Sequence, residues 1–456
     1  MSTENSFQSV RVLERPLSSM EKAVWLARHA GTHNCLAIAE IEGPLTAESL
    51  RKALDYIQKR HPLLQMRICT GKKGAVFRNT PDVPLIPLRI VDVPEGQWVE
   101  EAECELRVHL PIDTGPLLRC VMLRHSPTTS TLLLNYFHAV ADGFACGYLL
   151  RDLLLAATHD RDPAQSEPSP LPLPLSMEER IPRTAKGLLG VLRLFWLIAR
   201  EFVENLMKGG IPRKLTFDCW PSYEERRSRI LPFEFDKEFT DCLKARAQRE
   251  QTTVHGALCA AGLLAVSRIM TDGSPRLLAC TSSVDMRTRL DPPVKDEQGL
   301  FVSVLWSVQR VWKDRPFWDL AREVRRNLFR KIASGGHFAV LAGSSWLVPL
   351  LERLLPEGKE GSIRFSRIAE STMINYKGTG VSNGGAMELG GGVGPFKIRS
   401  FRGGVTLLNT GYFTALVSSF NGRLYINYIY NEPMITRARA QQLAETAVEL
   451  LKKAIA

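Results

Sequence analysis

The sequence predicts an α/β protein of two domains. Its 456 residues are 45% hydrophobic and 23% charged, which fits a globular protein of about two to three domains by length. Apolar runs of strand length alternate with runs of helical period in both halves, which predicts helices layered on sheets. The connection at 163–174 is rich in proline, which stiffens a surface segment and excludes a central strand. We therefore expect an N-terminal domain at 1–162, a connecting segment at 163–228 and a C-terminal domain at 229–456.

The connecting segment carries much of the positive charge. Residues 180–214 contain eight Lys or Arg and only two Glu, within a net charge of +11 for the chain. Residues 188–199 are apolar except for Gly190 and Arg193. This run is too short and too interrupted by charge to span a bilayer.

A helix through this segment would have one basic row. Lys186, Arg193 and Arg200 repeat every seven residues, so they share one stripe of a largely apolar helix. The preferred interpretation is a crossover helix packed on a domain, with paired arginines such as Arg200 with Glu204. The alternative is a helix that borders a hydrophobic acceptor site or contacts an anionic membrane through residues 186–207.

A histidine marks the predicted active site. His138 follows the apolar run 132–134, which reads as a buried strand, and precedes Asp142-Gly143 and a helical pattern from Phe144. Imidazole titrates near neutrality, so a histidine held rigidly at a strand end can accept a proton and return it. Taken alone, the pattern also fits a core histidine and a turn aspartate.

The segment resembles the His-His-x-x-x-Asp-Gly motif of acyltransferases with the chloramphenicol-acetyltransferase fold, a superfamily that includes condensation domains and polyketide-associated acyltransferases. Phe137 replaces the first histidine, which favours plain acyl transfer over peptide formation. Residues 390–395 read Gly-Gly-Gly-Val-Gly-Pro, where the plant acyltransferases carry Asp-Phe-Gly-Trp-Gly, so those enzymes are more distant. Other segments similar to the family, in the family's order, are residues 17–22, 45–68, 113–119, 284–293 and 382–384.

The resemblance implies two chloramphenicol-acetyltransferase-like domains in a pseudo-dimeric V shape, with a channel between them and His138 near its middle. His138 would be the general base. Asp142 would have a structural role, paired with Arg287 of the Asp-x-Arg-x-Arg segment. The backbone N–H of Gly143 is our candidate for the oxyanion donor, because a turn presents it beside His138.

Ser382 and Asn383 are second-rank candidates for the oxyanion site. They lie in Ser-Asn-Gly-Gly, and an ordinary turn is the preferred interpretation for both side chains. The pattern Gly-x-Ser-x-Gly at 380–384 also matches a hydrolase nucleophile elbow. That elbow needs a helix directly after the serine and a histidine further downstream, and no histidine follows His337. We reject the serine nucleophile.

The activity implied is transfer of an acyl group from a thioester to a hydroxyl or an amine, without a covalent acyl-enzyme. The donor would be acyl-CoA or acyl-phosphopantetheine on an acidic acyl carrier protein, with no bound cofactor, and the acceptor a small or natural-product molecule. A hydroxyl acceptor is preferred. The alternatives are a free-standing condensation enzyme that forms an amide from carrier-bound substrates, and a catalytically silent carrier-docking module.

Other chemistries lack sequence support. The nine cysteines contain no Cys-x-x-Cys pair or ligand spacing with histidine, so we expect no metal site. There is no phosphate-binding loop, and the basic charge lacks the interleaved aromatics of a nucleic-acid surface. Dispersed cysteines without a signal peptide predict a reducing cytoplasm, with membrane association through 186–207 as the alternative.

Overall fold

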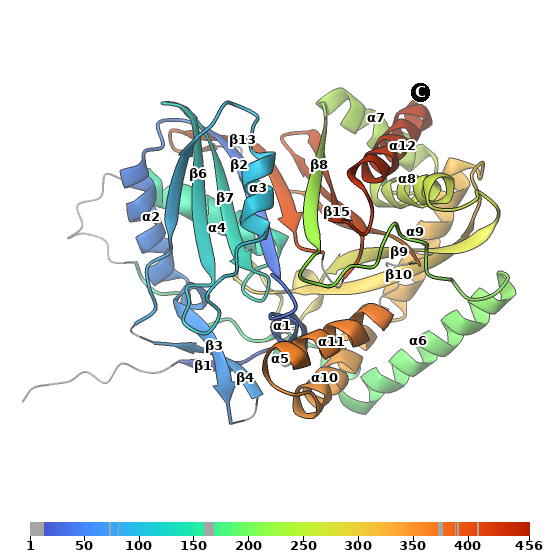
Figure 1. Cartoon of the computed structure of the whole chain (residues 1–456), viewed down its shortest axis with the longest axis horizontal. Helices are drawn as coiled ribbons and strands as arrows, with labels where there is room; N and C mark the ends of the chain where they lie inside the picture. Colours follow the sequence, from blue (N-terminus) through green and yellow to red (C-terminus); the bar gives the residue numbers. More distant parts are fainter. Residues whose placement is uncertain are drawn as a thin grey trace, which may run out of the picture.

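Two six-stranded sheets lie side by side, each covered by helices, and a three-stranded sheet lies at the edge of the first (Figure 1). The computed structural model describes residues 13–72, 74–80, 82–158, 168–372, 377–387, 389, 392–407 and 410–456. Pro163 of the Pro-rich connection and the glycines at 390 and 391 lie outside these residues. The α/β class predicted from the sequence is confirmed.

The first sheet carries the strand that leads to His138. Its strands, in spatial order, are β12 (Gly392–Val393), β13 (Phe396–Val405), β2 (Asn34–Glu42), β7 (Thr129–Phe137), β6 (Leu118–Ser126) and β5 (Leu88–Asp92). All neighbours are antiparallel except β5 and β6. In β7, Leu132 and Leu134 face one core and Leu133 faces another, so both sides of this central strand are buried.

The second sheet is mixed. Its order is β10 (Val302–Val311), β9 (Arg276–Asp285), β11 (Gly378–Ala386), β14 (Phe413–Phe420), β15 (Arg423–Glu432) and β8 (Arg227–Phe235). β11 runs parallel to both β9 and β14, and the other pairs are antiparallel. The small sheet consists of β1 (Glu14–Pro16), β4 (Gly74–Asn79) and β3 (Met66–Gly71).

Helices cover each large sheet. On the first sheet, α2 and α4 bury their apolar faces in one core. The second sheet packs mainly on α8 and α12, with α7 and α9 beside them. The bounds of these helices are α2 (Ala47–Arg60), α4 (Gly143–Ala157), α7 (Lys237–Arg249), α8 (Val254–Ile269), α9 (Phe317–Ala333) and α12 (Arg437–Ile455).

The two halves share a core, and the C-terminal half contributes two strands to the first sheet. Side chains of α3 (Val99–Leu106) and the first sheet pack against Ile230 of β8 and Ile429 of β15. The sheets also depart from the predicted boundary, because β12 and β13 belong to the C-terminal segment yet complete the first sheet. The segment 1–162 therefore does not form its sheet alone, whereas the second sheet consists only of strands between Arg227 and Glu432.

A third group of helices lies beneath the sheets in Figure 1. It consists of α1 (Ser19–Leu26), α5 (Met177–Arg180), α6 (Gly187–Met207), α10 (Gly336–Leu354) and α11 (Gly358–Thr372). Short 3₁₀ turns occur at Pro62–Gln65, Arg183–Ala185 and Arg287–Arg289. In the described chain no single helix has the length and apolar character of a membrane span, and only α7 and α8 pass that test as a pair, bent by 95°.

Candidate active site

His138 is fixed by the backbone at the end of β7. The strand ends at Phe137, which pairs with Asn34 of β2. The backbone N–H of His138 donates to the carbonyl oxygen of His33 (2.9 Å), and Val140 N–H then donates back to Phe137 (3.0 Å). The ring therefore leaves the sheet from a tight turn whose backbone groups are paired.

The hydrogen bonding of the His138 ring defines its tautomer. Nδ1 lies 3.1 Å from the carbonyl oxygen of Ala141. A carbonyl only accepts, so Nδ1 carries the proton and Nε2 keeps its lone pair. Burial lowers the pKa of His138, and the hydrogen bond to Ala141 and the nearby Asp142 charge oppose this only partly. The ring is therefore neutral near pH 7, the state that a general base requires.

Asp142 turns into the protein and touches several donors. It is the N-cap of α4, and its Oδ1 accepts from Ala145 N–H (2.8 Å). Oδ2 accepts from the backbone N–H of Phe301 (3.0 Å), just before β10. The guanidinium of Arg287 donates to both carboxylate oxygens (2.8 and 3.0 Å). The carboxylate is buried and fully engaged, so it has no free lone pair for His138.

Arg287 comes from the other half of the chain. It is 3% exposed, and its second nitrogen donates to the carbonyl oxygens of Lys295 and Glu297 (3.0 and 3.1 Å). The contact between Asp142 and Arg287 that the resemblance implies is present. It fastens the start of α4, next to the catalytic turn, to the loop after β9.

The loop before β10 completes this junction, and no pattern in the sequence predicted it. Gly299 accepts the backbone N–H of Asp142 (3.1 Å), and the side chain of Gln298 donates to Ala145 O (2.9 Å). Gly299 has φ +145°, and a Cβ there would lie 2.6 Å from the ring of Phe301. Only glycine fits both the backbone angle and the space.

Gly143 presents its backbone beside His138. It is the first residue of α4, and its N–H is one of the first-turn donors that have no partner within a helix. No hydrogen bond to this N–H occurs within the described residues. A Cβ at Gly143 would meet nothing within 4 Å, so the space on the side-chain side of this residue is open. An N–H without a partner in the first turn of a helix is able to donate to a substrate atom.

The other predicted site residues lie elsewhere. Phe137 is 1% exposed and packs in the core of the first half. The sequence predicts that Ser382 and Asn383 lie in a turn. The structure instead places them in β11, in register with Leu416 and Val417 of β14. The expected turn is reduced to an irregularity after Asn383, whose side chain accepts Gly385 N–H (2.8 Å).

Ser382 has no catalytic setting in this sheet. Within the described residues, no hydrogen bond or ion pair links Ser382 or Asn383 to His138 or Gly143. The strand also continues through Ser382 to Ala386. A nucleophile elbow needs the serine at a turn from strand to helix, so the rejection of that interpretation is confirmed.

Two further histidines are buried with an unpaired ring nitrogen. Within the described residues His33 Nε2 has no hydrogen-bond partner, and burial lowers the pKa of His33 to about 4, with His138 as a smaller cause. His337 is in the first turn of α10. In the same part of the chain its Nδ1 has no partner, and burial lowers the pKa of His337 to about 4. His33 contributes to the site through its backbone, since its carbonyl oxygen holds His138.

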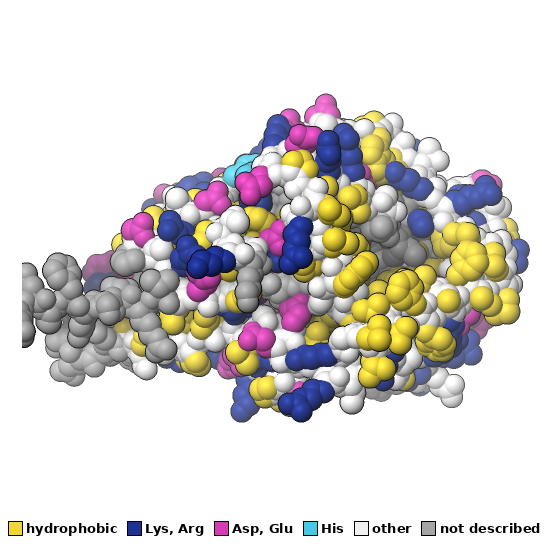
Figure 2. All heavy atoms as spheres, turned by 90° about the horizontal axis from the view of Figure 1, so that it is seen from below, with side chains coloured by type: hydrophobic (Ala, Val, Ile, Leu, Met, Phe, Trp, Pro, Cys, Tyr) yellow, Lys and Arg dark blue, Asp and Glu magenta, His cyan; other side chains and the backbone are white. Residues whose placement is uncertain are grey.

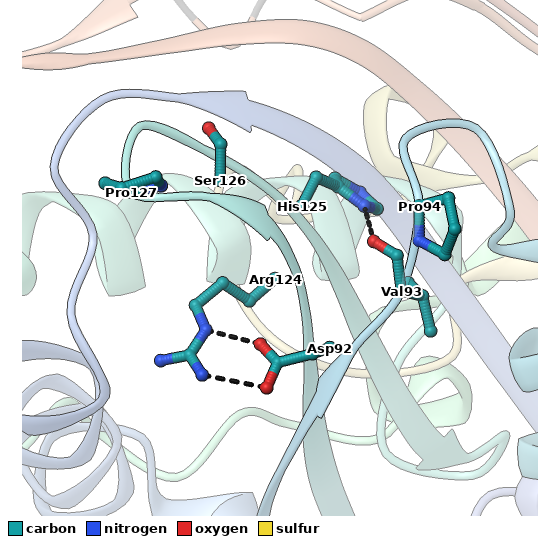
Figure 3. A pocket seen from close by; sticks show the side chains of 7 residues that line it. All are labelled: Asp92, Val93, Pro94, Arg124, His125, Ser126 and Pro127. Atoms are coloured by element: carbon teal, nitrogen blue, oxygen red, sulfur yellow. Dashed lines mark hydrogen bonds and ion pairs between the residues drawn. The ribbon is translucent and has the colours of Figure 1, made fainter.

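A surface hollow of about 620 Å³ lies at the far end of the β6–β7 hairpin (Figure 3). Arg124 and Asp92 form a bidentate ion pair there (2.6 and 2.9 Å). Both nitrogens of His125 are occupied, one by Val93 O and the other by Thr131 Oγ1. These groups satisfy one another, so the hollow offers no free catalytic group.

The described residues contain no group of three His, Cys, Asp or Glu side chains placed to hold a metal. The nine cysteines are unpaired thiols. The chemistry available at His138 is therefore that of a neutral imidazole, a free backbone N–H and a buried ion pair that holds them.

Part of the chain matches a known family, and longer parts match known proteins. Residues 225–347 match the family model described as phthiocerol/phthiodiolone dimycocerosyl transferase C-terminus. Chondramide synthase of Chondromyces crocatus is 30% identical over 54% of this chain, which is 6% of that protein. Phosphinothricin tripeptide synthetase of Streptomyces viridochromogenes is 27% identical over 70% of this chain and 30% of its own length. The chain thus spans a small part of these relatives.

Solved structures show the same fold over nearly the whole chain. Polyketide synthase associated protein 5 from Mycobacterium tuberculosis has a TM-score of 0.66 at 16% identity, covering 97% of this chain and 98% of that one. The trichothecene 15-O-acetyltransferase of Fusarium sporotrichioides has a TM-score of 0.71 at 13% identity, covering 98% of this chain and 96% of that one. The first condensation domain of the calcium-dependent antibiotic synthetase has a TM-score of 0.68 at 17% identity, covering 97% of this chain and 96% of that one.

The two sheets of this chain match the two pseudo-dimeric subdomains of these folds. The family match over residues 225–347, the synthetase relative and the shared fold together support a place for the chain in the superfamily of condensation domains and chloramphenicol-acetyltransferase-like acyltransferases.

Proposed function

We propose that this enzyme transfers an acyl group from a thioester to a hydroxyl of a small acceptor, with His138 as general base. The observation that carries the proposal is the tautomer of His138. Its Nδ1–H is held by Ala141 O, so the lone pair of Nε2 is available. General-base catalysis of this kind contributes roughly 10²–10⁴-fold in rate.

The reaction needs no covalent enzyme intermediate. The acceptor oxygen attacks the thioester carbon while Nε2 of His138 takes its proton, and the carbonyl oxygen becomes an oxyanion. The free N–H of Gly143 donates to that oxyanion. Collapse of the intermediate breaks the C–S bond, and the imidazolium returns the proton to the leaving thiolate. At the end of the cycle His138 is neutral again, and the proton of the acceptor hydroxyl is on the released thiol.

The proposed donor is acyl-CoA or an acyl-phosphopantetheine on an acidic carrier protein. Both carry phosphate, and the net charge of +11 favours their approach. One relative is named a synthase and another a tripeptide synthetase, both much longer than this chain, and a large synthetase fits a carrier-bound donor. No bound cofactor takes part in this chemistry.

Amide formation is the second candidate, because the name of one relative is a tripeptide synthetase. An amine acceptor would use the same base and the same oxyanion donor. Phe137 in place of a first motif histidine favours the hydroxyl acceptor. Matched alcohol and amine acceptors of the same carbon skeleton distinguish the two.

The test follows thioester loss by mass spectrometry, with acyl-CoAs from short to long chain and then with acyl-carrier substrates. Wild type, His138→Ala and the control His109→Ala are compared, since His109 is an exposed histidine. We expect chain-length-selective loss in wild type and control, and at least about 10²-fold less in His138→Ala. Equal rates in His138→Ala and wild type would overturn the proposal.

A further inference from the structure

The helix α6 has its apolar side facing outward. Its buried residues are Gly190, Leu197, Glu201 and Asn205, a stripe that is mostly small or polar. Large apolar side chains lie on the opposite side and are about half exposed or more. Among them are Leu188, Leu192, Phe195, Trp196, Phe202 and Met207. This is the reverse of the usual arrangement, in which the apolar stripe faces the core.

Close packing on α10 explains the orientation of α6. A Cβ at Gly190 would lie 2.6 Å from Ala342 Cβ, and one at Gly343 would lie 2.2 Å from the side chain of Leu194. The buried Glu201 is bound by Lys331 (2.5 Å). The small residues and this ion pair fix the inner stripe, so the bulky side chains have no place inside.

Helix α10 extends the exposed surface. Trp346 is 64% exposed and Leu354 is 69% exposed, so both helices present aromatic and aliphatic side chains to solvent. Hydrophobic side chains gather over this part of the molecule in the view from below (Figure 2). We name this surface, formed by the outward side chains of α6 and α10, the apolar face. A contiguous exposed surface of this kind marks an interaction site.

Positive charge borders the apolar face. Arg193 follows Lys186 by seven residues, in a row along the edge of the apolar side of α6. In the described chain no carboxylate pairs with Arg193, with Arg183 before α6 or with Arg353 of α10. The acidic residues of α6 are neutralised, because Glu201 binds Lys331 and Glu204 binds Arg200 and Arg330. The border is therefore cationic.

We propose that the apolar face docks on the surface of an anionic phospholipid membrane. α6 would lie in the plane of the interface over its length of about 31 Å, with Phe195 and Trp196 below the headgroups. Arg193 and Lys186 would reach lipid phosphates from the border. A second copy of this chain fits less well, because a two-fold contact with antiparallel α6 helices would bring identical cationic rows together. The inference does not depend on the reaction at His138.

The experiment is co-sedimentation of the full chain with lipid vesicles. Vesicles of phosphatidylcholine alone are compared with equal parts of phosphatidylcholine and phosphatidylglycerol. The double variant Leu192→Glu/Phe195→Glu tests the apolar contact, and Arg193→Gln tests the charge. Leu85→Glu is the matched control, since Leu85 is 62% exposed on the first half of the chain. Circular dichroism checks that each variant is folded.

We expect wild type and Leu85→Glu to bind the anionic vesicles and not the neutral ones. The double variant should lose at least about tenfold in partition, and Arg193→Gln about fivefold, which corresponds to about 1 kcal/mol per basic residue. Equal binding of wild type and the double variant would overturn the proposal. So would the absence of vesicle binding, whether the chain sediments as a monomer or as a dimer that Leu192→Glu/Phe195→Glu dissociates.

Discussion

The substitution Asp142→Asn should lower both the free energy of unfolding and the activity, and for the same structural reason. The carboxylate accepts four hydrogen bonds, from Ala145 N–H, from Phe301 N–H and twice from Arg287. An asparagine has one oxygen and one NH₂ group. In either orientation of the amide, the NH₂ faces the guanidinium and one backbone N–H, so donors meet donors.

The larger effect is on Arg287. The substitution leaves its guanidinium 3% exposed and bound only to the carbonyls of Lys295 and Glu297. Removing one partner of a buried ion pair costs about 3–5 kcal/mol. Total stabilities of natural proteins are about 5–15 kcal/mol, so the loss is a large fraction. The turn that holds His138 precedes Asp142 directly, and it loses its anchor at the same time.

The assay is guanidinium chloride unfolding followed by tryptophan fluorescence, beside thioester consumption. Asp92→Asn is the control, because Asp92 forms a bidentate pair with Arg124 on the surface, and we expect no measurable change there. The double variant Asp142→Asn/Arg287→Met removes both charges and should regain part of the lost stability. An Asp142→Asn protein that unfolds at the wild-type midpoint and is still inactive would refute the structural role.

Four further outcomes follow from the site. Because burial lowers the pKa of His138, kcat/KM should fall on the acid side with a midpoint below the usual 6.5 of histidine, and a midpoint above it would exclude His138 as the base. Burial lowers the pKa of His33 in the folded protein to about 4, so between pH 6.5 and 4 the unfolded chain binds one proton more than the folded one. The free energy of unfolding therefore falls as the pH falls through this window. His33→Gln should reduce this loss by roughly 3 kcal/mol in unfolding experiments measured across the window. Gly143→Pro is tolerated at the first position of a helix but removes the N–H, so kcat should drop about 10²–10³-fold, whereas Gly143→Ala, which keeps the N–H, separates the effect of side-chain bulk. Gly299→Ala should lower the unfolding midpoint clearly, because the new methyl meets the ring of Phe301; an unchanged midpoint would mean that the loop adapts.

Local features of the site could be predicted from the sequence. The strand before His138 and the helix from Gly143 follow from an apolar run, a turn and a helical period within a few residues. The partner of Asp142 lies 145 residues away, and only the resemblance to a known motif indicated Arg287. The supporting loop with Gly299 carries no such pattern, because a glycine required by a ring contact looks like any loop glycine.

The pairing of strands that are distant in the chain could not be predicted from the sequence, for a physical reason. β13 pairs with β2 across more than 350 residues, and an apolar strand does not encode which sheet it joins. Ser382 and Asn383 sit in a glycine-rich segment, whose composition favours a turn, but pairing with β14 overrides that preference. For α6 the heptad of basic residues was visible, but small residues that contact α10 decide which side is buried.

The engagement of Asp142 bears on the kind of ester the proposed reaction can use. In a serine hydrolase an aspartate orients the histidine and stabilises its protonated form. Here the carboxylate is committed to Arg287 and two backbone donors, and a neutral carbonyl of Ala141 orients the ring. The imidazolium therefore gains little from a paired carboxylate, and burial disfavours it further. A base of this kind is weak, and it suits an acyl donor that is already activated. A thioester, whose thiolate leaves readily, meets that requirement, whereas an amide or a simple oxygen ester would demand stronger assistance from the enzyme.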